Sequence, residues 1–200
     1  MKILMFGNSF TFYNDMPDML AKKLGAQVVA YTRGGARLAE FLNPSTEMGE
    51  LTDKALTREK WDYVVLQEMS NGPITAKAKF MQSVADLCEK IRINGATPLL
   101  YATWAYKKNG DKMKMMNCSY EEMSQSMTAS YKEAAEVNNT LMAGVGTYFY
   151  ELAEQNELYA EDGYHPNELG SQIAAKVIAE TILQDQNENR KQIREEPSDD

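Results

Sequence analysis

The sequence contains little cysteine and almost no histidine. Its 200 residues include two cysteines, Cys88 and Cys118, and a single histidine, His165. Two cysteines this far apart form neither a disulfide framework nor a metal site of recognisable spacing. We therefore expect a reduced protein without a structural metal, since a chain of this length can bury a sufficient core unaided.

Basic residues are also scarce relative to acidic ones. The chain has 21 Lys and Arg against 29 Asp and Glu, which gives a formal net charge of -8. Nucleic-acid surfaces need clustered Lys and Arg, and a negative surface is repelled by anionic membranes. This balance argues against nucleic-acid and membrane partners and says little about a small neutral ligand. Nothing in the sequence indicates an oligomeric state.

Long hydrophobic runs are absent. There is no apolar span of about 20 residues and no apolar leader of signal-peptide length, because the chain begins directly with the short run KILMF. If Met1 is the native start, we expect a cytoplasmic protein. If a leader once preceded it, the protein is secreted or periplasmic.

Short apolar runs instead alternate with longer amphipathic stretches. The short runs are typical of strands covered on both faces, and the amphipathic stretches are typical of helices. The predicted strands are Lys2–Gly7, Gln27–Thr32, Asp62–Gln67, Pro98–Thr103 and Leu141–Val145. The predicted helices are Asp15–Leu24, Leu51–Arg58, Thr75–Ile93, Tyr120–Val137, a short one ending near Asn156, and about Asn167–Leu183.

This alternation predicts an α/β fold with a five-stranded parallel sheet. Right-handed crossovers place helices on both faces, which makes a flavodoxin-like three-layer α/β/α sandwich. We expect one domain over residues 1–183. Residues 184–200 are almost free of apolar side chains, so they are predicted to form a disordered polar tail.

Parallel sheets bind ligands beyond the carboxyl ends of their strands, so the residues that follow the strands are candidates for the site. Ser9 follows the first strand, Gly34-Gly35 follows the second, and Gln67 closes the third. Each also has a structural interpretation: a turn or cap for the serine, an ordinary loop for the glycines, and solvation of a strand end for the glutamine.

The segment before the last helix contains Asp162 and His165. Pro166 favours the first turn of a helix, which predicts His165 at or near the helix N-cap. Asp162 lies three residues earlier across a turn and can reach the second ring nitrogen, although Asp162-Gly163 is also a common plain turn. Together with Ser9 and the glycine loop, these residues supply a nucleophile, a base and oxyanion donors.

These motifs resemble those of the SGNH hydrolase superfamily. Gly7-Asn8-Ser9 is similar to the Gly-Asp-Ser of its first block, Gly35 to the glycine of its second, and Asp162-x-x-His165 to its last. The resemblance follows the order of elements from about residue 3 to residue 183. It implies a flavodoxin-like fold, Ser9 as nucleophile, His165 as base, Asp162 as its partner, and an oxyanion hole that includes the Gly35 N–H.

The third block departs from the superfamily. In place of Gly-x-Asn-Asp the chain has LQEMSN, so the side-chain oxyanion donor must be a different amide. We predict Gln67 for this role, with Asn71 as the alternative.

The resemblance implies a cofactor-free serine esterase for small acyl esters, with acetylated carbohydrates as a candidate class. The alternatives are a non-catalytic flavodoxin-like module that binds a sugar or another small molecule, and an acyltransferase with the same fold. The methionine-rich loop Tyr106–Cys118 is predicted either to cover the acyl pocket or to be a solvated connection, and Trp104 either walls the pocket or belongs to the core.

Overall fold

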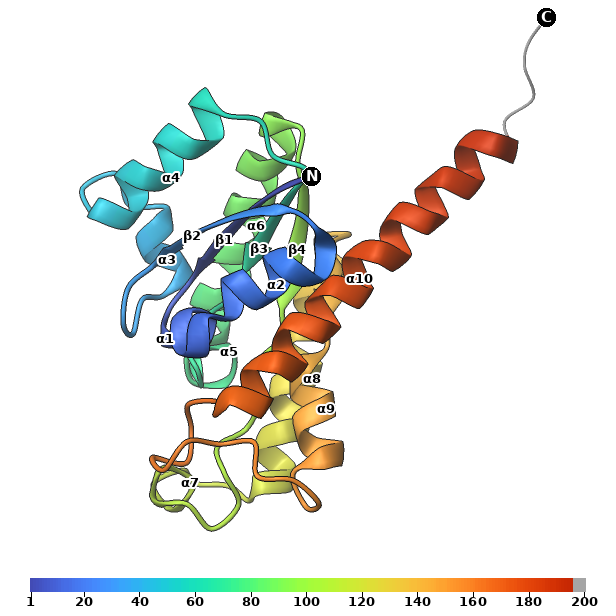
Figure 1. Cartoon of the computed structure of the whole chain (residues 1–200). Coiled ribbons are helices and arrows are strands. Elements are labelled where there is room, and N and C mark those ends of the chain that lie inside the picture. The colour runs from blue at the N-terminus through green and yellow to red at the C-terminus, as the bar shows by residue number, and fades with distance from the viewer. Residues whose placement is uncertain (196–200) are drawn as a thin grey trace, which may run out of the picture.

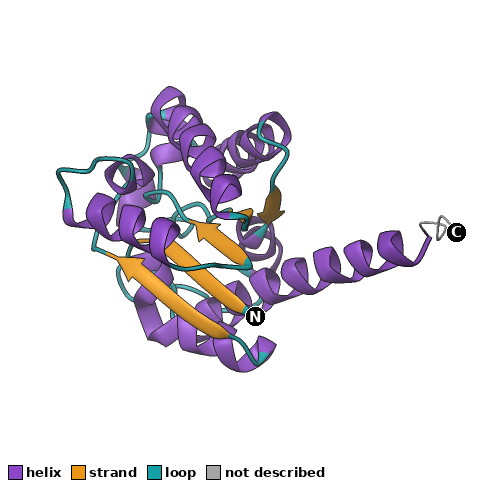
Figure 2. Cartoon of the chain, turned by 90° about the horizontal axis from the view of Figure 1, so that it is seen from above, coloured by secondary structure: helices purple, strands orange, loops and turns teal. Residues whose placement is uncertain are grey.

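The computed structural model describes residues 1–195 and contains a sheet of five parallel strands in the order β2-β1-β3-β4-β5. Helices cover both faces of this sheet, so the predicted three-layer α/β/α architecture is confirmed (Figures 1 and 2). The strands are β1 (Lys2–Gly7), β2 (Gln27–Thr32), β3 (Tyr63–Leu66), β4 (Thr97–Tyr101) and β5 (Leu141–Ala143).

The central strands are apolar because both of their faces are buried. Ile3 and Met5 of β1 pack into one core, whereas Leu4 and Phe6 pack into the core on the opposite face. Phe6 lies beside Leu66 in the register of β1 and β3, so the two strands end at the same level. The residues that follow them therefore meet at one edge of the sheet.

Two groups of helices form the outer layers. Buried side chains of α3 (Leu38–Phe41), α4 (Glu47–Arg58), α6 (Lys77–Asn94) and α8 (Tyr120–Val137) join one core. Buried side chains of α1 (Ser9–Phe12), α2 (Met16–Leu24), α9 (Val145–Leu152) and α10 (Glu168–Glu195) join the other. The short elements η1 (Tyr13–Asp15), α5 (Gly72–Thr75) and α7 (Asp111–Lys114) lie in the connections.

Capping side chains and a glycine set the ends of several helices. Ser119 and Glu122 form a capping box that starts α8, with the Glu122 N–H donating to Ser119 Oγ at 3.1 Å. Gly25 ends α2 with a φ of 57°, a left-handed conformation that glycine adopts without steric cost. Helix α4 is longer than predicted because Thr46 caps it at Gly49, ahead of the apolar positions that suggested a start at Leu51.

The prediction of a disordered tail over residues 184–200 is wrong for residues 184–195. Helix α10 continues to Glu195, twelve residues past Leu183, and projects from the body of the protein (Figure 1). The Tyr63 hydroxyl donates to Asp185 at 2.6 Å, and Gln184 donates to Glu188 at 2.9 Å along the helix. Polar residues at a spacing of four can extend a helix without an apolar face. The rest of that prediction, residues 196–200, lies outside the described residues.

The helices of the described region include none that is long and apolar enough to cross a membrane.

Candidate active site

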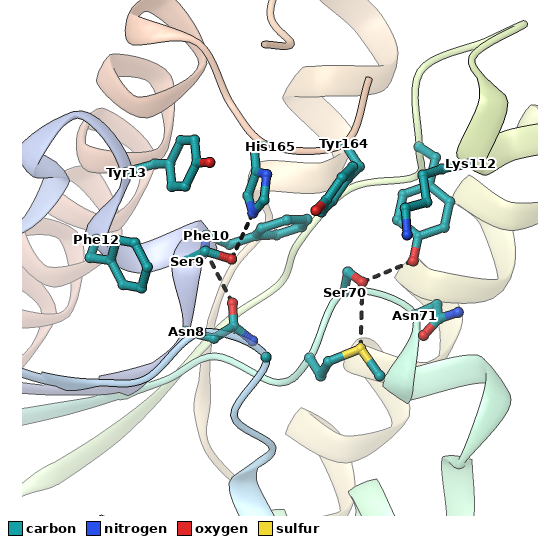
Figure 3. A pocket seen from close by; sticks show the side chains of 14 residues that line it. Asn8, Ser9, Phe10, Phe12, Tyr13, Ser70, Asn71, Lys112, Tyr164 and His165 are labelled. Carbon is teal, nitrogen blue, oxygen red and sulfur yellow. Dashed lines mark hydrogen bonds between the residues drawn. The ribbon is translucent and has the colours of Figure 1, made fainter. Parts of the chain in front are cut away.

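Ser9 is presented by the turn between β1 and α1. Asn8 caps α1, its Oδ1 accepting a hydrogen bond from the Phe10 N–H at 3.1 Å, so Ser9 is the first residue of the helix. Gly7 permits this turn because a Cβ atom there would lie 2.4 Å from Thr11 Oγ1. The turn carries the Ser9 hydroxyl into a cavity at the carboxyl edge of the sheet (Figure 3).

The structure brings Ser9, His165 and Asp162 together in one hydrogen-bonded chain. His165 Nε2 lies 2.7 Å from Ser9 Oγ, and His165 Nδ1 lies 2.6 Å from Asp162 Oδ2. The serine and the histidine are 156 positions apart in the sequence and come from opposite ends of the domain (Figure 3). This is the geometry that a serine nucleophile, a general base and an orienting carboxylate require.

Asp162 is held by its own turn as well as by the imidazole. Its Oδ1 accepts hydrogen bonds from the Tyr164 N–H at 3.1 Å and the His165 N–H at 3.0 Å. Burial disfavours the charged carboxylate, but the hydrogen bonds from the His165 ring and the two N–H groups outweigh it and lower the pKa of Asp162. Asp162 is therefore ionised and acts as an acceptor at neutral pH.

His165 lies near the start of α10, as predicted, but is not itself the cap. Helix α10 begins at Glu168, and Asn167 Oδ1 accepts from the Gly170 N–H at 2.9 Å, so Asn167 is the cap and His165 lies two residues before it. His165 instead belongs to a closed loop in which Tyr159 pairs with Pro166 and the Ala160 N–H donates to the His165 carbonyl at 2.9 Å. This pairing holds the backbone at His165, and the hydrogen bond to Asp162 orients the imidazole.

Aromatic rings enclose the imidazole of His165. Tyr13 stacks on it with the ring centroids 4.1 Å apart and the planes inclined by 6°, and Tyr164 packs at 4.1 Å with an inclination of 37°. The Asn14 side chain donates to the Pro166 carbonyl at 3.1 Å, which connects the turn bearing Tyr13 to the segment bearing His165. Sequence reasoning missed Tyr13, whose only signal was its position shortly after the candidate serine.

The second strand-end loop lies beside Ser9. Asn8 Nδ2 donates to the Ala36 carbonyl at 3.0 Å, which holds Gly34 and Gly35 at the wall of the cavity. Gly35 has a φ of 70°, which is favourable for glycine alone. Within residues 1–195 neither the Ser9 N–H nor the Gly35 N–H donates a hydrogen bond, so both donors remain available at the cavity.

Gln67 does not face the cavity, and the prediction that it donates to an oxyanion does not fit its surroundings. It is fully buried, and its Oε1 accepts from the Asn8 N–H at 2.8 Å and the Thr11 hydroxyl at 2.9 Å. Its Nε2 donates to the Glu68 carbonyl. The physical reason is that Gly7 has no side chain, so the Gln67 amide fills the space beneath the Ser9 turn.

Asn71, the alternative donor, does line the cavity. Its Nδ2 lies 3.8 Å from Met116 Sδ, and Figure 3 shows it on the far side of Ser70 from Ser9. Its assignment as an oxyanion donor stays a prediction.

The cavity has a volume of about 660 Å³, and five of its fourteen lining residues are Phe or Tyr. Its walls are formed by Asn8, Ser9, Phe10, Phe12, Tyr13, Gly34, Gly35, Met69, Ser70, Asn71, Tyr106, Lys112, Tyr164 and His165. The described residues include no group of three His, Cys, Asp or Glu side chains arranged to hold a metal ion.

The methionine-rich segment and Trp104 contribute differently from each other. Helix α7 brings Lys112 to the cavity, while Met113 is buried in the core and Met115 is 80% exposed, so the methionines of this segment do not line the cavity.

Trp104 is buried, stacks on Phe10 at 4.7 Å, and donates to the Tyr164 carbonyl at 3.0 Å. It belongs to the core and supports the cavity wall from behind.

Comparison with models of known families assigns the chain to one family. Residues 3–178 match the model of the GDSL-like lipase/acylhydrolase family. The chain belongs to this family and is a serine hydrolase of the SGNH type that acts on ester bonds, which confirms the resemblance seen in its motifs. The family assignment also removes the alternative of a non-catalytic binding module. A comparison with curated proteins finds no match.

Solved structures agree with the assignment. A protein of Slackia heliotrinireducens, described as a candidate SGNH hydrolase, is 47% identical, with 91% of this chain and 98% of that chain covered and a TM-score of 0.87. An acetylxylan esterase of Geobacillus stearothermophilus is 16% identical, with 90% and 93% covered and a TM-score of 0.66. A DUF4886 family protein of Bacteroides uniformis is 22% identical, with 92% and 83% covered and a TM-score of 0.70. The last two share the fold.

Proposed function

We propose that the chain hydrolyses small acyl esters, acetyl esters foremost, with Ser9 as nucleophile, His165 as general base and Asp162 as its orienting carboxylate. The observation that carries this proposal is the continuous chain of hydrogen bonds of 2.7 Å and 2.6 Å that joins the three side chains at the wall of a cavity. A triad is recognised by this geometry and by the roles of its members, not by sequence position.

In the first half of the cycle, Ser9 Oγ attacks the ester carbonyl carbon. His165 Nε2 accepts the hydroxyl proton as the bond forms, and the resulting imidazolium is stabilised by Asp162 through Nδ1. His165 then gives this proton to the leaving alcohol oxygen, and the acyl group remains on Ser9.

The negative charge of the tetrahedral intermediate needs donors that are already in position. The N–H groups of Ser9 and Gly35 are both uncommitted at the cavity wall, and we propose them as the oxyanion hole. Asn8 contributes indirectly, because its side chain ties the Gly35 loop to the Ser9 turn. With Gln67 directed into the core, Asn71 is the remaining candidate for a side-chain donor.

In the second half, water attacks the acyl-enzyme while His165 takes its proton. Collapse of the second tetrahedral intermediate releases the acid and returns the proton to Ser9. The proposed cycle needs no cofactor.

An acetylated carbohydrate is the substrate class that the cavity supports best. Phe12 is 40% exposed, lies beside Tyr13 and lines the cavity, so it offers an aromatic surface on which the apolar face of a bound sugar ring can pack. The structural likeness to an acetylxylan esterase is consistent with this class.

The test compares wild type, Ser9→Ala and His165→Ala on p-nitrophenyl acetate and on acetylated xylo-oligosaccharides. We expect each substitution to lower kcat/KM by a factor on the order of 10³ or more. Ser45→Ala is the matched control, because Ser45 is exposed on a loop and does not line the cavity, and we expect it to retain wild-type activity. Full activity of Ser9→Ala would reject the proposed nucleophile.

A further inference from the structure

One end of the cavity carries an uncompensated positive charge. Lys112 of α7 lines the cavity together with Ser70 and Asn71, and Figure 3 draws these three on the side of the cavity opposite Ser9. A lysine is charged at neutral pH. The described residues that line the cavity include neither Asp nor Glu, so the charge faces the cavity without a carboxylate on its walls.

The neighbouring lysines of the same connection are paired elsewhere. Lys107 pairs with Glu157, Lys108 with Glu121 at 2.6 Å, and Lys114 with Asp111 at 2.8 Å. Lys112 forms no ion pair within the described residues; its Nζ lies 5.0 Å from the centre of the Tyr164 ring. Among the lysines of this connection, Lys112 is therefore the one that lines the cavity.

Hydrogen-bond donors accompany Lys112 at this end. The hydroxyls of Ser70 and Tyr106 are 2.9 Å apart and both residues line the cavity. Burial raises the pKa of the Tyr106 phenol more than its hydrogen bond to Ser70 lowers it, so Tyr106 remains protonated. Ser70 Oγ also lies 3.5 Å from Met69 Sδ, a weak acceptor; when the Ser70 hydroxyl donates to Tyr106 instead, the phenol proton is left to donate to a ligand.

Two contacts connect the Tyr106 end of the cavity to the loop that bears His165. Tyr106 packs edge-on against Tyr164 at 6.0 Å, and the Lys107 N–H donates to the Gly163 carbonyl at 2.8 Å. These contacts join the chain at Tyr106 and Lys107 to the loop that bears His165, and the exposed Lys112 side chain reaches the Tyr164 ring of that loop.

We propose that this end of the cavity is a carboxylate subsite, formed by Lys112 with the hydroxyls of Ser70 and Tyr106. This inference rests on the proposed function, and it specifies the substrate further: the preferred esters carry a carboxylate in the part that extends from Ser9 toward Lys112. Such a group pairs with the ammonium and accepts the free hydroxyl proton. Acetyl esters of acidic sugars or of hydroxy acids belong to this class.

The test uses pairs of esters that differ only in charge. Para-acetoxybenzoate against para-acetoxybenzamide places the carboxylate on the alcohol part. The mono-p-nitrophenyl ester of adipic acid against its ω-amide places it on the acyl part. For one of the pairs we expect wild type to favour the carboxylate about fivefold in kcat/KM, the range of a partly exposed ion pair, and this preference to shrink as salt is added.

Lys112→Met should reduce this ratio to about one, and Lys112→Arg should keep it. Lys114→Met is the matched control, because Lys114 lies on the same short helix and does not line the cavity; its ratio should equal that of wild type. A wild-type ratio near one for both pairs, or an unchanged ratio in Lys112→Met, would overturn the subsite.

A binding experiment separates failure of the subsite from failure of the proposed function. Para-acetamidobenzoate and para-acetamidobenzamide are titrated into wild type and Lys112→Met by calorimetry, which needs no turnover. Tighter binding of the carboxylate that Lys112→Met abolishes supports the subsite even if Ser9-dependent hydrolysis is absent. Equal binding of these two compounds by wild type, together with equal binding of the mono-p-nitroanilide of adipic acid and its ω-amide, overturns it even if the esterase is active.

Discussion

Ser9 and Gln67 follow neighbouring strands of the same sheet, yet they lie in opposite environments. Each comes just after a buried apolar strand, and β1 and β3 end side by side. Ser9 reaches the cavity and His165, whereas Gln67 is fully buried and accepts from the Asn8 N–H. One residue is positioned for chemistry and the other supports the turn that positions it.

The difference comes from the residue each side chain meets. Gly7 has no side chain, so the space beside it is filled by the Gln67 amide; a Cβ on Gly7 would lie 2.7 Å from Gln67 Oε1. Ser9 starts a helix that leaves the sheet, so its hydroxyl is free of such packing. A polar residue at a strand end is therefore a site candidate only when its neighbours leave the cavity side open to it.

Ser9→Ala should separate activity from stability most clearly. We expect a loss in kcat/KM on the order of 10³ or more, with thermal unfolding close to that of wild type, because the removed hydroxyl faces the cavity and packs against no core residue. Parallel kinetics and scanning calorimetry check this. A large fall in Tm would mean that Ser9 is a structural residue.

Gln67→Ala should instead lower the stability of the fold. It leaves the buried Asn8 N–H and the buried Thr11 hydroxyl without their acceptor, and it opens a cavity. We expect a loss of about 2–4 kcal/mol in the free energy of unfolding, measured with urea. Gln82→Ala is the control: Gln82 is exposed on α6, and its loss should cost less than about 0.5 kcal/mol.

Tyr13→Ala tests the contribution of the ring that stacks on His165. Loss of the ring stacked on His165 should lower kcat by roughly tenfold through poorer positioning of the imidazole, with KM for a small acetyl ester changed less. Tyr13→Phe keeps the stacked ring and should restore most of kcat. Equal losses in both variants would assign the effect to the hydroxyl.

Glu68→Gln should give the smallest effect, and that effect should depend on pH. Burial raises the pKa of Glu68, although the N–H groups of Met69 and Leu38 and the charge of Arg37 oppose the shift. A raised carboxyl pKa in the folded state means that wild type loses stability as pH rises from about 4, the unfolded value, through the folded pKa.

The free energy of unfolding of wild type, relative to Glu68→Gln, should therefore be greatest at acidic pH and decline toward neutrality. Urea titrations across this range measure the difference. A difference that grows with pH would contradict the assignment.

Much of the architecture was accessible from the sequence. Buried parallel strands are continuous apolar runs, so β1 and β2 were predicted with their observed bounds. Helix α8 was also predicted with its observed bounds, from its amphipathic pattern. Helix α10 was predicted too short, because polar residues that extend a helix by local hydrogen bonds resemble a disordered tail in composition.

The sequence by itself determined the class of fold, the family and the residues from which the proposed nucleophile and base are drawn, because strand periodicity and the order of the motifs are local properties of the chain. Only the tertiary structure decided that Gln67 lies beneath the Ser9 turn, that Tyr13 stacks on His165 and that Lys112 faces the cavity. These positions depend on how side chains from separate segments share space, and packing between distant segments leaves no periodic trace in the sequence.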